Sequence, residues 1–297
     1  MKILITGING QVGSALVRQA KAQGHDVIAI AREQWDMAQS PGQGEELVLE
    51  TKPDLVINPA AYTNVDSAED DEATALKVNA DAPRALAKGC EQLDIPIFHV
   101  STDYVFDGAS KTPYLVNSRT HPLSIYGQTK RRGEEVLKKY LNDYAILRLS
   151  GVFSDHANCF PLSILTAALN RTELRVVNDQ FTGPTSVHSI GIILDLMAQR
   201  ALAGDLNWGI YHFAQQPFLS WYDFAQMIIT KARDQDSRYS AVKVIPITTE
   251  ECDAKAPRPK YACLESEKLL SELRVDHSIL SRDLDLDNVI YSIICKL

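Results

Sequence analysis

Lys2-Ile3-Leu4-Ile5-Thr6-Gly7-Ile8-Asn9-Gly10-Gln11-Val12-Gly13 is the stretch of sequence that decides the fold. Lys2 to Thr6 is short, mostly apolar and rich in β-branched residues, which is typical of a strand buried on both faces of a parallel sheet. Helical character follows from Ala15 and ends at Gly24, and His25 to Ile30 reads as a second strand. The glycines therefore lie in the first turn of a β-α-β unit.

Glycines in such a turn have a use in ligand binding. They permit a tight turn and a close approach of the backbone to a pyrophosphate, and the helix N-terminus then offers free N–H groups to the anion. A glycine-rich turn without a ligand is the other interpretation, but the flanking strands and helix favour dinucleotide binding. The turn supplies these candidate cofactor contacts: Gly7, Asn9, Gly10, Gln11, Val12 and Gly13.

The residues after the second strand bear on which dinucleotide binds. Arg32 lies where a guanidinium could meet a 2′-phosphate, which favours NADPH. Glu33 could instead serve a ribose diol, which keeps NADH as an alternative, and Arg32 would then be an ordinary surface residue. Asp36 and Met37, further along the same loop, are also candidate cofactor contacts.

Strands and helices alternate over the first half of the chain. Further strands are expected at 54–58, 95–100 and 144–149, with helices at 45–51, at 66–93 and from about 126 to 140. This alternation predicts an α/β fold with a Rossmann-type doubly wound parallel sheet, in a dinucleotide-binding domain of residues 1–150. The later segments are shorter, so residues 151–297 are predicted to form a second, smaller α/β substrate lobe, from which about 177–200 can return to the first domain.

The third strand ends in small residues. Ala60 and Ala61, followed by Tyr62, stand where open α/β sheets bind ligands, and their small side chains let a cofactor lie against the backbone. Simple packing is the other interpretation. Asn79 falls inside the helix predicted after this strand, and we expect it to be solvated, with only a weak structural role.

Candidate catalytic residues follow the fourth strand. Tyr126 and Lys130 are four residues apart, which places both on one face of a helix, and a nearby cation favours the phenolate. Tyr-x-x-x-Lys alone is a weak signal. Beside a dinucleotide site, however, it suits hydride transfer to a carbonyl, with Tyr126 as the proton donor. We expect Thr102 to donate a hydrogen bond to the same oxygen, and Lys130 to stabilise the tyrosinate and hold a ribose hydroxyl.

The composition and charge of the chain exclude some classes of binding partner. A net charge of −8 and the lack of a long basic run argue against nucleic acid or a membrane surface. The cysteines are scattered without a CxxC pair, which indicates reduced thiols and neither a zinc site nor a disulfide framework. No leader or apolar segment of membrane-spanning length is evident, so a cytoplasmic location is expected.

Several motifs together resemble a known family. In chain order they are Gly7 to Gly13, Ala60 to Glu69, Ser101 to Gly108, Tyr126 to Lys130, Asn178 to Thr185, and Arg258-Pro259 followed by Leu264. They are similar, over nearly the whole chain, to those of the dTDP-4-dehydrorhamnose reductases, an extended branch of the short-chain dehydrogenase/reductases. The resemblance implies reduction of the C4 ketone of dTDP-4-dehydro-L-rhamnose with NADPH or NADH, in the synthesis of precursors of cell-surface polysaccharides.

The resemblance also implies roles for individual residues. Thr102, Tyr126 and Lys130 would form the catalytic set, Tyr104 would lie against the sugar, and Arg258 would meet the nucleotide end of the substrate. Related 4,6-dehydratases carry Thr-Asp-Glu where this chain has Thr102-Asp103-Tyr104. The base that dehydration needs is therefore missing.

Some positions depart from the family pattern. Gly151 stands where the family has a tryptophan that lines the sugar site, so a large stacking surface is lost, and Tyr261-Ala262 replaces a common Asn-Ser. Ala15 replaces a glutamate with which some members bind magnesium, so no metal is expected. Another nucleotide-linked 6-deoxy-4-ketohexose, or an epimerase reaction, stays an alternative. A regulatory NADP-binding subunit of a partner enzyme is another, and a homodimer is left open.

Overall fold

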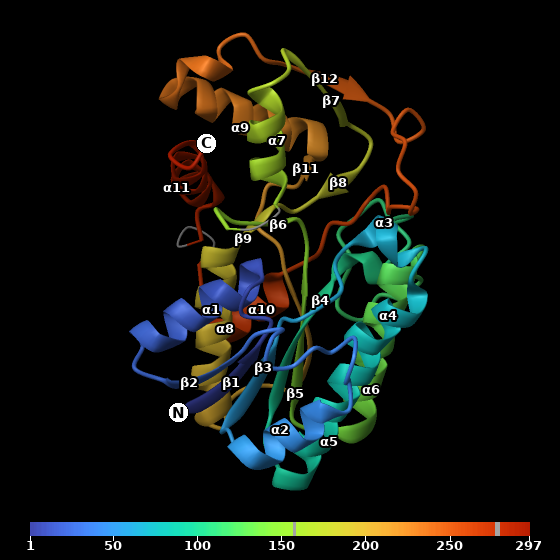
Figure 1. Cartoon of the computed structure of the whole chain (residues 1–297), viewed down its shortest axis with the longest axis vertical. Coiled ribbons are helices and arrows are strands. Elements are labelled where there is room, and N and C mark those ends of the chain that lie inside the picture. The colour runs from blue at the N-terminus through green and yellow to red at the C-terminus, as the bar shows by residue number, and fades with distance from the viewer. Residues whose placement is uncertain (157–158, 277–279) are drawn as a thin grey trace.

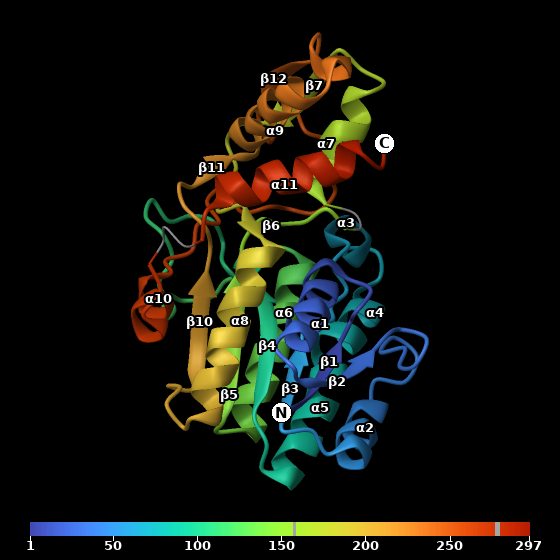
Figure 2. The ribbon, with the colours of Figure 1, turned by 90° about the vertical axis from the view of Figure 1, so that its left-hand side faces the viewer.

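The centre of the molecule is a parallel sheet of six strands. A computed structural model describes residues 1–156, 159–276 and 280–297. The strand order is β10-β5-β4-β3-β1-β2, which can be followed in Figure 2. The strands are β1 (Lys2–Thr6), β2 (Asp26–Ile30), β3 (Leu55–Asn58), β4 (Ile97–Thr102), β5 (Tyr144–Leu149) and β10 (Gly209–Phe213). The predicted α/β fold with a Rossmann-type parallel sheet is confirmed.

Helices cover both faces of this sheet (Figure 2). One layer contains α1 (Gln11–Ala22), α8 (Val187–Leu202) and α10 (Glu267–Leu273), and the other contains α2 (Gln43–Thr51), α5 (Ala82–Leu93) and α6 (Ile125–Tyr140). Side chains of a strand point alternately to the two faces. Ile3 and Ile5 therefore pack in the core beneath α1 and α8, whereas Leu4 packs in the core beneath α2 and α5.

The first glycine turn lies at the point where the strand order reverses. From β1 the chain moves outward to β2 and then returns to β3, on the other side of β1. Ligands of open α/β sheets bind at such switch points, outside the carboxyl ends of the strands. Gly7 has φ 59°, and a Cβ there would lie 2.8 Å from Ala60 Cα. The loops after β1 and β3 therefore approach too closely for any residue but glycine.

A smaller lobe lies beyond the carboxyl edge of the sheet, in the upper part of Figure 1. It packs α7 (Phe160–Ala168), α9 (Trp221–Gln235) and α11 (Arg282–Ile294) around a separate apolar core that includes Phe153, Phe224 and Ile290. Its parallel strands β7 (Glu173–Val177) and β12 (Lys243–Ile247) lie side by side. The short strands β6 (Val152–Phe153), β8 (Phe181–Thr182), β9 (Thr185–Ser186) and β11 (Leu219–Ser220) join this lobe to the sheet.

The chain crosses between the two lobes more often than the predicted boundaries 1–150 and 151–297 provide for. Helix α8 packs against α1, and β10 pairs with β5 at the edge of the sheet. Strand β10 lies beyond the returning segment of about 177–200 that the sequence suggested. Strand β10 supplies hydrogen-bond partners to the edge of β5, which would otherwise be open, and its Tyr211 and Phe213 are buried.

The single long helix predicted at 66–93 is wrong. Two short helices, α3 (Val65–Ala68) and α4 (Glu72–Leu76), precede a π-helical turn, η1 (Lys77–Asp81), and only then does α5 begin. Asp71 explains the break between α3 and α4, because its side chain accepts an N–H at the start of α4, just as Asn64 does at the start of α3. Such π-helical turns occur frequently at functional sites.

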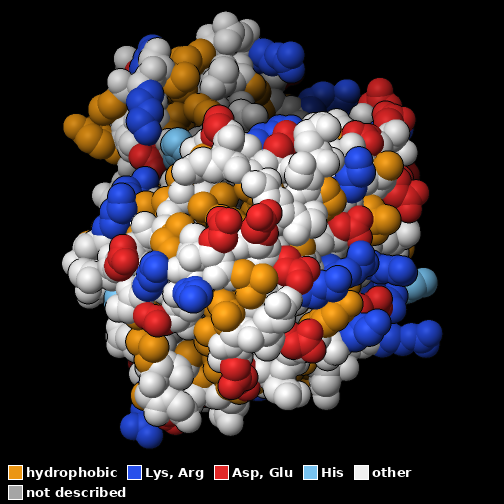
Figure 3. All heavy atoms as spheres, turned by 60° about the horizontal axis from the view of Figure 1, so that its bottom comes forward, with side chains coloured by type: hydrophobic (Ala, Val, Ile, Leu, Met, Phe, Trp, Pro, Cys, Tyr) orange, Lys and Arg blue, Asp and Glu red, His pale blue; other side chains and the backbone are white. Residues whose placement is uncertain are grey.

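The surface seen from the lower end of Figure 1 carries side chains of both signs. Figure 3 shows acidic and basic groups interspersed there, with hydrophobic side chains between them. Among the described residues, no helix is long and apolar enough to cross a membrane.

Candidate active site

A cavity of about 750 Å³ opens at the carboxyl edge of the sheet, and residues of both lobes line it. Nearly all of the predicted cofactor contacts line it: Gly7, Gly10, Gln11, Val12, Gly13, Arg32, Asp36, Met37, Ala60, Ala61, Tyr62, Tyr126 and Lys130. Asn9 does not line it; that side chain is exposed and donates to Glu33. Of the remaining predicted residues, Thr102, Tyr104 and Gly151 line the cavity and Arg258 does not.

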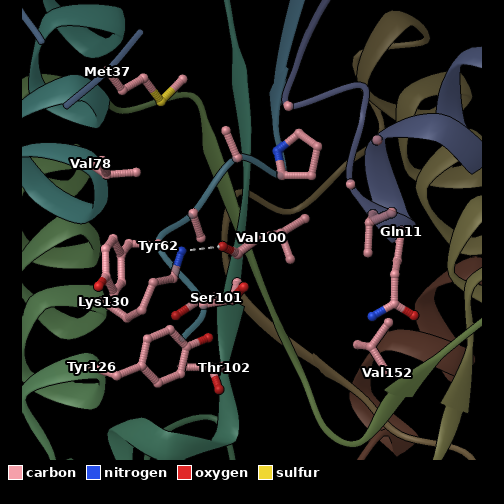
Figure 4. A pocket seen from close by; sticks show the side chains of 18 of the residues that line it. Gln11, Met37, Tyr62, Val78, Val100, Ser101, Thr102, Tyr126, Lys130 and Val152 are labelled. Atoms are coloured by element: carbon pink, nitrogen blue, oxygen red, sulfur yellow. Dashed lines mark hydrogen bonds between the residues drawn. The ribbon is translucent and has the colours of Figure 1, made fainter. Parts of the chain in front are cut away.

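The cavity has two walls, which Figure 4 shows from close by. Tyr62, Tyr126 and Lys130 lie on one side, and Gln11 and Val152 lie on the other. The end of β4 runs between them. A long, flat ligand such as a dinucleotide can therefore extend from the glycine turn toward the Tyr126 phenol.

Tyr126 is positioned by the start of α6. Ser124 caps this helix by accepting the Gly127 N–H at 3.2 Å, which fixes the first turn on which Tyr126 stands. The phenol points toward Thr102 in Figure 4. Burial raises the pKa of Tyr126 to about 12, while the neighbouring Thr102 hydroxyl lowers it and the charge of Asp103 raises it. Tyr126 is therefore protonated at neutral pH and can donate a proton.

Lys130 lies one helical turn further on and is almost completely buried, at 1% exposure. Its Nζ donates to Val100 O at 2.7 Å and lies 3.3 Å from His99 Nε2. Burial lowers the pKa of Lys130 to about 8, although the charge of Glu134 raises it. The ammonium is thus held at the cavity wall and is only weakly favoured over the amine at neutral pH.

Thr102 does not direct its hydrogen into the cavity. Its Oγ1 donates to Asp103 Oδ1 at 2.9 Å and accepts the Tyr104 N–H at 3.2 Å. The sequence predicted that Thr102 donates to the substrate oxygen, and for this the hydroxyl must first rotate. Burial raises the pKa of Asp103 to about 6, and hydrogen bonds from Ser150 and Thr102 lower it.

Asp103 is in turn connected to the smaller lobe. Ser150 Oγ donates to Asp103 Oδ2 at 2.7 Å and lies 2.9 Å from Ala262 O and 2.7 Å from Thr182 Oγ1. The geometry of the Thr102 hydroxyl therefore depends on how the 182 and 262 segments pack against the end of β4.

Tyr104 and Arg258, both predicted to contact the substrate, lie next to each other. The ring of Tyr104 packs edge-on against that of Tyr126, with centroids 5.6 Å apart. Arg258 binds Asp66 through both Nη atoms, at 3.1 and 2.7 Å. Burial raises the pKa of the neighbouring Tyr104, and a hydrogen bond with Arg258 offsets part of this rise. Arg258 is thus oriented by a carboxylate beside the cavity.

Gly151 is held in a backbone conformation that a side chain would strain. Its φ is 56°, and a Cβ there would lie 2.9 Å from Pro184 Cα. A tryptophan therefore cannot replace this glycine on the present backbone, so glycine does not simply leave room that an indole would fill. Trp221, at the start of α9, supplies an aromatic side chain to the cavity instead.

Asn79 is fully buried, so the prediction that it is solvated is wrong. Its Oδ1 accepts the Tyr62 N–H at 2.8 Å, and its Nδ2 donates to Tyr62 O at 3.2 Å and to Thr129 Oγ1 at 3.0 Å. Asn79 therefore fixes the loop that lines the cavity after β3. Its place on the apolar stripe with Ala75, Ala82 and Leu86 was the available signal.

Trp221 and Val152 also line the cavity, and both come from the second half of the chain. Neither had a local signal, because they reach the site only when the lobes pack. No group of three or more His, Cys, Asp or Glu suited to a metal ion occurs in residues 1–156, 159–276 and 280–297. The expectation of no metal stays a prediction.

Comparisons with known proteins place the chain in a family. A family model described as the RmlD substrate binding domain matches residues 1–283. A dTDP-4-dehydrorhamnose reductase from Aggregatibacter actinomycetemcomitans is 35% identical over 285 residues, which are 95% of this chain and 97% of that protein.

Solved structures are similar over the full length. A dTDP-4-dehydrorhamnose reductase from Clostridium acetobutylicum superposes with a TM-score of 0.88 at 33% identity, covering 100% of both chains. Another from Bacillus anthracis, in complex with NADP, superposes with a TM-score of 0.85 at 28% identity, covering 100% of this chain and 99% of that one. The chain belongs to the RmlD substrate binding domain family, that of the dTDP-4-dehydrorhamnose reductases.

Proposed function

We propose that this protein is an NAD(P)H-dependent reductase that converts dTDP-4-dehydro-L-rhamnose to dTDP-L-rhamnose. The observation that carries the proposal is the placement of a protonated Tyr126 and a buried Lys130 at the wall of a cavity that begins at the glycine turn. The family membership, shown over most of the chain, supports the same reaction.

The cofactor is NADPH, with NADH as an alternative. The cavity suits it, because the close approach of the Gly7 and Ala60 loops leaves only backbone and small side chains beside a pyrophosphate. Arg32, which pairs with Asp36 at 3.3 Å, lies at the cavity wall as a partner for a 2′-phosphate. The relative from Bacillus anthracis binds NADP in the same fold.

When bound, the nicotinamide supplies the hydride that reduces the C4 carbonyl. Tyr126 then gives its proton to the oxygen, on which negative charge develops as the hydride arrives. Lys130 favours the resulting tyrosinate through its charge and holds a ribose hydroxyl of the cofactor. Thr102 holds the phenol as a hydrogen-bond partner and donates to the substrate oxygen once its hydroxyl turns away from Asp103.

The nucleotide sugar occupies the side of the cavity nearest Tyr104. Tyr104 and Trp221 provide flat surfaces for the sugar and base. Arg258 contacts Tyr104 without being part of the cavity lining, and its guanidinium is the group that we propose for binding the diphosphate. No carboxylate stands at position 104 to remove a proton, so the substrate is reduced without dehydration.

The test is to incubate the purified protein with dTDP-4-dehydro-L-rhamnose and NADPH, and to follow the absorbance of the reduced cofactor. We expect stoichiometric oxidation of NADPH. Tight NADPH binding without oxidation, with this sugar or with other nucleotide-linked 6-deoxy-4-ketohexoses, would instead support the regulatory alternative. Oxidation with only one of the other sugars would correct the substrate and leave the reaction class intact.

A further inference from the structure

A row of polar side chains crosses the sheet beneath the cavity and ends on Lys130. Thr6, Asn58 and His99 stand side by side on β1, β3 and β4, and all three are fully buried. Thr6 Oγ1 donates to Asn58 Oδ1 at 2.6 Å, and Asn58 Nδ2 lies 3.1 Å from His99 Nδ1. His99 Nε2 is 3.3 Å from Lys130 Nζ. The row therefore makes continuous polar contact from the middle of the sheet to the lysine amine.

Such a row is costly in an apolar sheet unless every polar group has a partner. The preceding positions on the same strands are Ile5, Ile57 and Phe98, all buried and apolar. Residues of that kind would fill the sheet interior without the cost. What the polar row adds is a contact to the Lys130 amine at its open end.

The hydrogen bonds of the row have a direction. Asn58 Nδ2 can only donate, so His99 Nδ1 accepts, and the neutral ring then carries its hydrogen on Nε2. That hydrogen points at Lys130 Nζ, which can accept it only as an uncharged amine. His99 itself stays neutral, because burial and then the charge of Lys130 hold its pKa well below the usual value.

Half a turn of the Asn58 amide reverses this direction. Asn58 Oδ1 then accepts from His99 Nδ1, and His99 Nε2 accepts from Lys130, which is now an ammonium. Asn58 Nδ2 donates to Thr6 Oγ1. Each of the three contacts has a donor and an acceptor in both arrangements, and the charge of Lys130 decides which one forms.

We propose that His99 is a positioning residue for Lys130, which it holds in place in both the charged and the uncharged form by changing its tautomer. The inference rests on the proposed reductase function. In that reaction Tyr126 gives a proton to the substrate oxygen, Lys130 returns one to the phenolate, and solvent reprotonates the amine. Lys130 therefore passes through both forms in each turnover and must keep its place in each.

The other ionisable groups around Lys130 do not duplicate this contact. Tyr126 and Glu134 stand on the same helix, and Asp103 follows β4. Glu134 is occupied by Arg148 of β5, at 2.6 Å, and by the Ser101 hydroxyl, at 2.7 Å. Glu134 stabilises the ammonium through its charge. Among the ionisable side chains of the described residues, only His99 contacts Nζ, and the Val100 carbonyl that Nζ also contacts can accept a hydrogen bond but cannot donate one.

The tautomer can be observed directly in the wild-type protein. Nitrogen-15 spectra of the histidine rings distinguish Nδ1–H from Nε2–H, and the His99 signals are assigned by their loss in His99→Gln. We expect Nδ1–H while Lys130 is charged and Nε2–H at higher pH, with the change near pH 8, where Lys130 titrates. A single tautomer from about pH 6 to pH 10 would overturn the proposal. The experiment needs no turnover, so it stands apart from a failure of the proposed reaction.

Kinetics provide the second test. In His99→Phe the ammonium loses its acceptor while it stays buried, so the alkaline limb of kcat should move about one unit to lower pH. In His99→Gln the amide can donate or accept a hydrogen bond at a similar distance, so the alkaline limb of kcat should return most of the way to its wild-type pH. His212→Phe is the matched control, because His212 is equally buried in β10 but contacts Arg148 and Tyr114 instead of Lys130. If His99→Phe folds and the alkaline limb of its kcat lies at the same pH as in the wild type, the proposal is contradicted. If the variant does not fold, the tautomer spectra of the wild type decide whether the proposal holds.

Discussion

Tyr126 and Lys130 reach the cavity from successive turns of one helix, whereas Arg258 comes from the far half of the chain and is oriented by Asp66, 192 residues away. The first pair, with Thr102, forms the catalytic end that we propose, and this end is anchored to the sheet through Val100, His99 and Asp103. Tyr104, Gly151 and Arg258 form the substrate end that we propose, where loops of both lobes meet. In this proposal the chemistry depends on rigid elements, and substrate recognition depends on the packing of the lobes.

From this contrast we expect the two ends of the site to affect different kinetic constants. Changes at the catalytic end should lower kcat and leave the binding of cofactor and sugar nearly unchanged. Changes at the substrate end should raise the KM for the nucleotide sugar or reduce stability.

Tyr126→Phe is expected to have the largest effect. It removes the proton donor and leaves the ring that packs against Tyr104, so kcat should fall about 10²–10⁴-fold. Stopped-flow or steady-state oxidation of NADPH measures the loss, and fluorescence titration with NADPH should give a nearly unchanged Kd. Retention of the wild-type rate would remove Tyr126 from the role of proton donor.

Gly151→Ala tests whether the substrate end depends on backbone conformation. We expect a loss of roughly 2 kcal/mol in the free energy of unfolding, from the left-handed φ and from the contact with Pro184. Gly204→Ala is the matched control, because its φ is 69° with nothing within 4 Å of the added Cβ. Urea unfolding should show the smaller loss for Gly204→Ala, and equal losses would show that Pro184 is not a constraint.

Arg258→Gln should separate binding from chemistry. It removes the guanidinium for the diphosphate, so the KM for the nucleotide sugar should rise on the order of tenfold while kcat changes little. Lys255→Gln is the control, since Lys255 pairs with Asp70 in the same loop contact but is half exposed. An equal rise in KM for both variants would show that the loop, rather than the guanidinium, is responsible.

Arg32→Ala should have the smallest effect and concerns the cofactor alone. The side chain is 75% exposed, so its contact with a 2′-phosphate would be partly screened. We expect the affinity for NADPH to fall several-fold and that for NADH to stay the same, by titration of both cofactors. Equal weakening of the two would assign Arg32 a role other than binding the 2′-phosphate.

The same contrast explains which features the sequence could predict. The glycine turn, the small residues after β3 and the Tyr126–Lys130 spacing are local patterns, and the structure places them around one cavity as the β-α-β rules require. The smaller lobe was predicted only in outline, as an α/β lobe of residues 151–297.

Features that depend on distant contacts were not predictable in the same way. Three contacts join segments that are far apart in the sequence. They are the Asp66–Arg258 ion pair, the hydrogen bond from Ser150 to Asp103 and the pairing of β10 with β5. The break in the helix predicted at 66–93 was not predicted, because the apolar stripe is continuous and the short capping motif within it is a weaker signal. Asn79 lay on that stripe, where a polar residue indicates a buried partner.

The most direct test of the account follows the hydride itself. The protein is given dTDP-4-dehydro-L-rhamnose and NADPH that carries deuterium at the transferred position of the nicotinamide, and the product is examined by NMR and mass spectrometry. The account predicts dTDP-L-rhamnose with one deuterium, bound to C4 of the sugar. Recovery of unreduced ketone with deuterated cofactor still bound, or of a sugar epimerised without net transfer of deuterium, would contradict it.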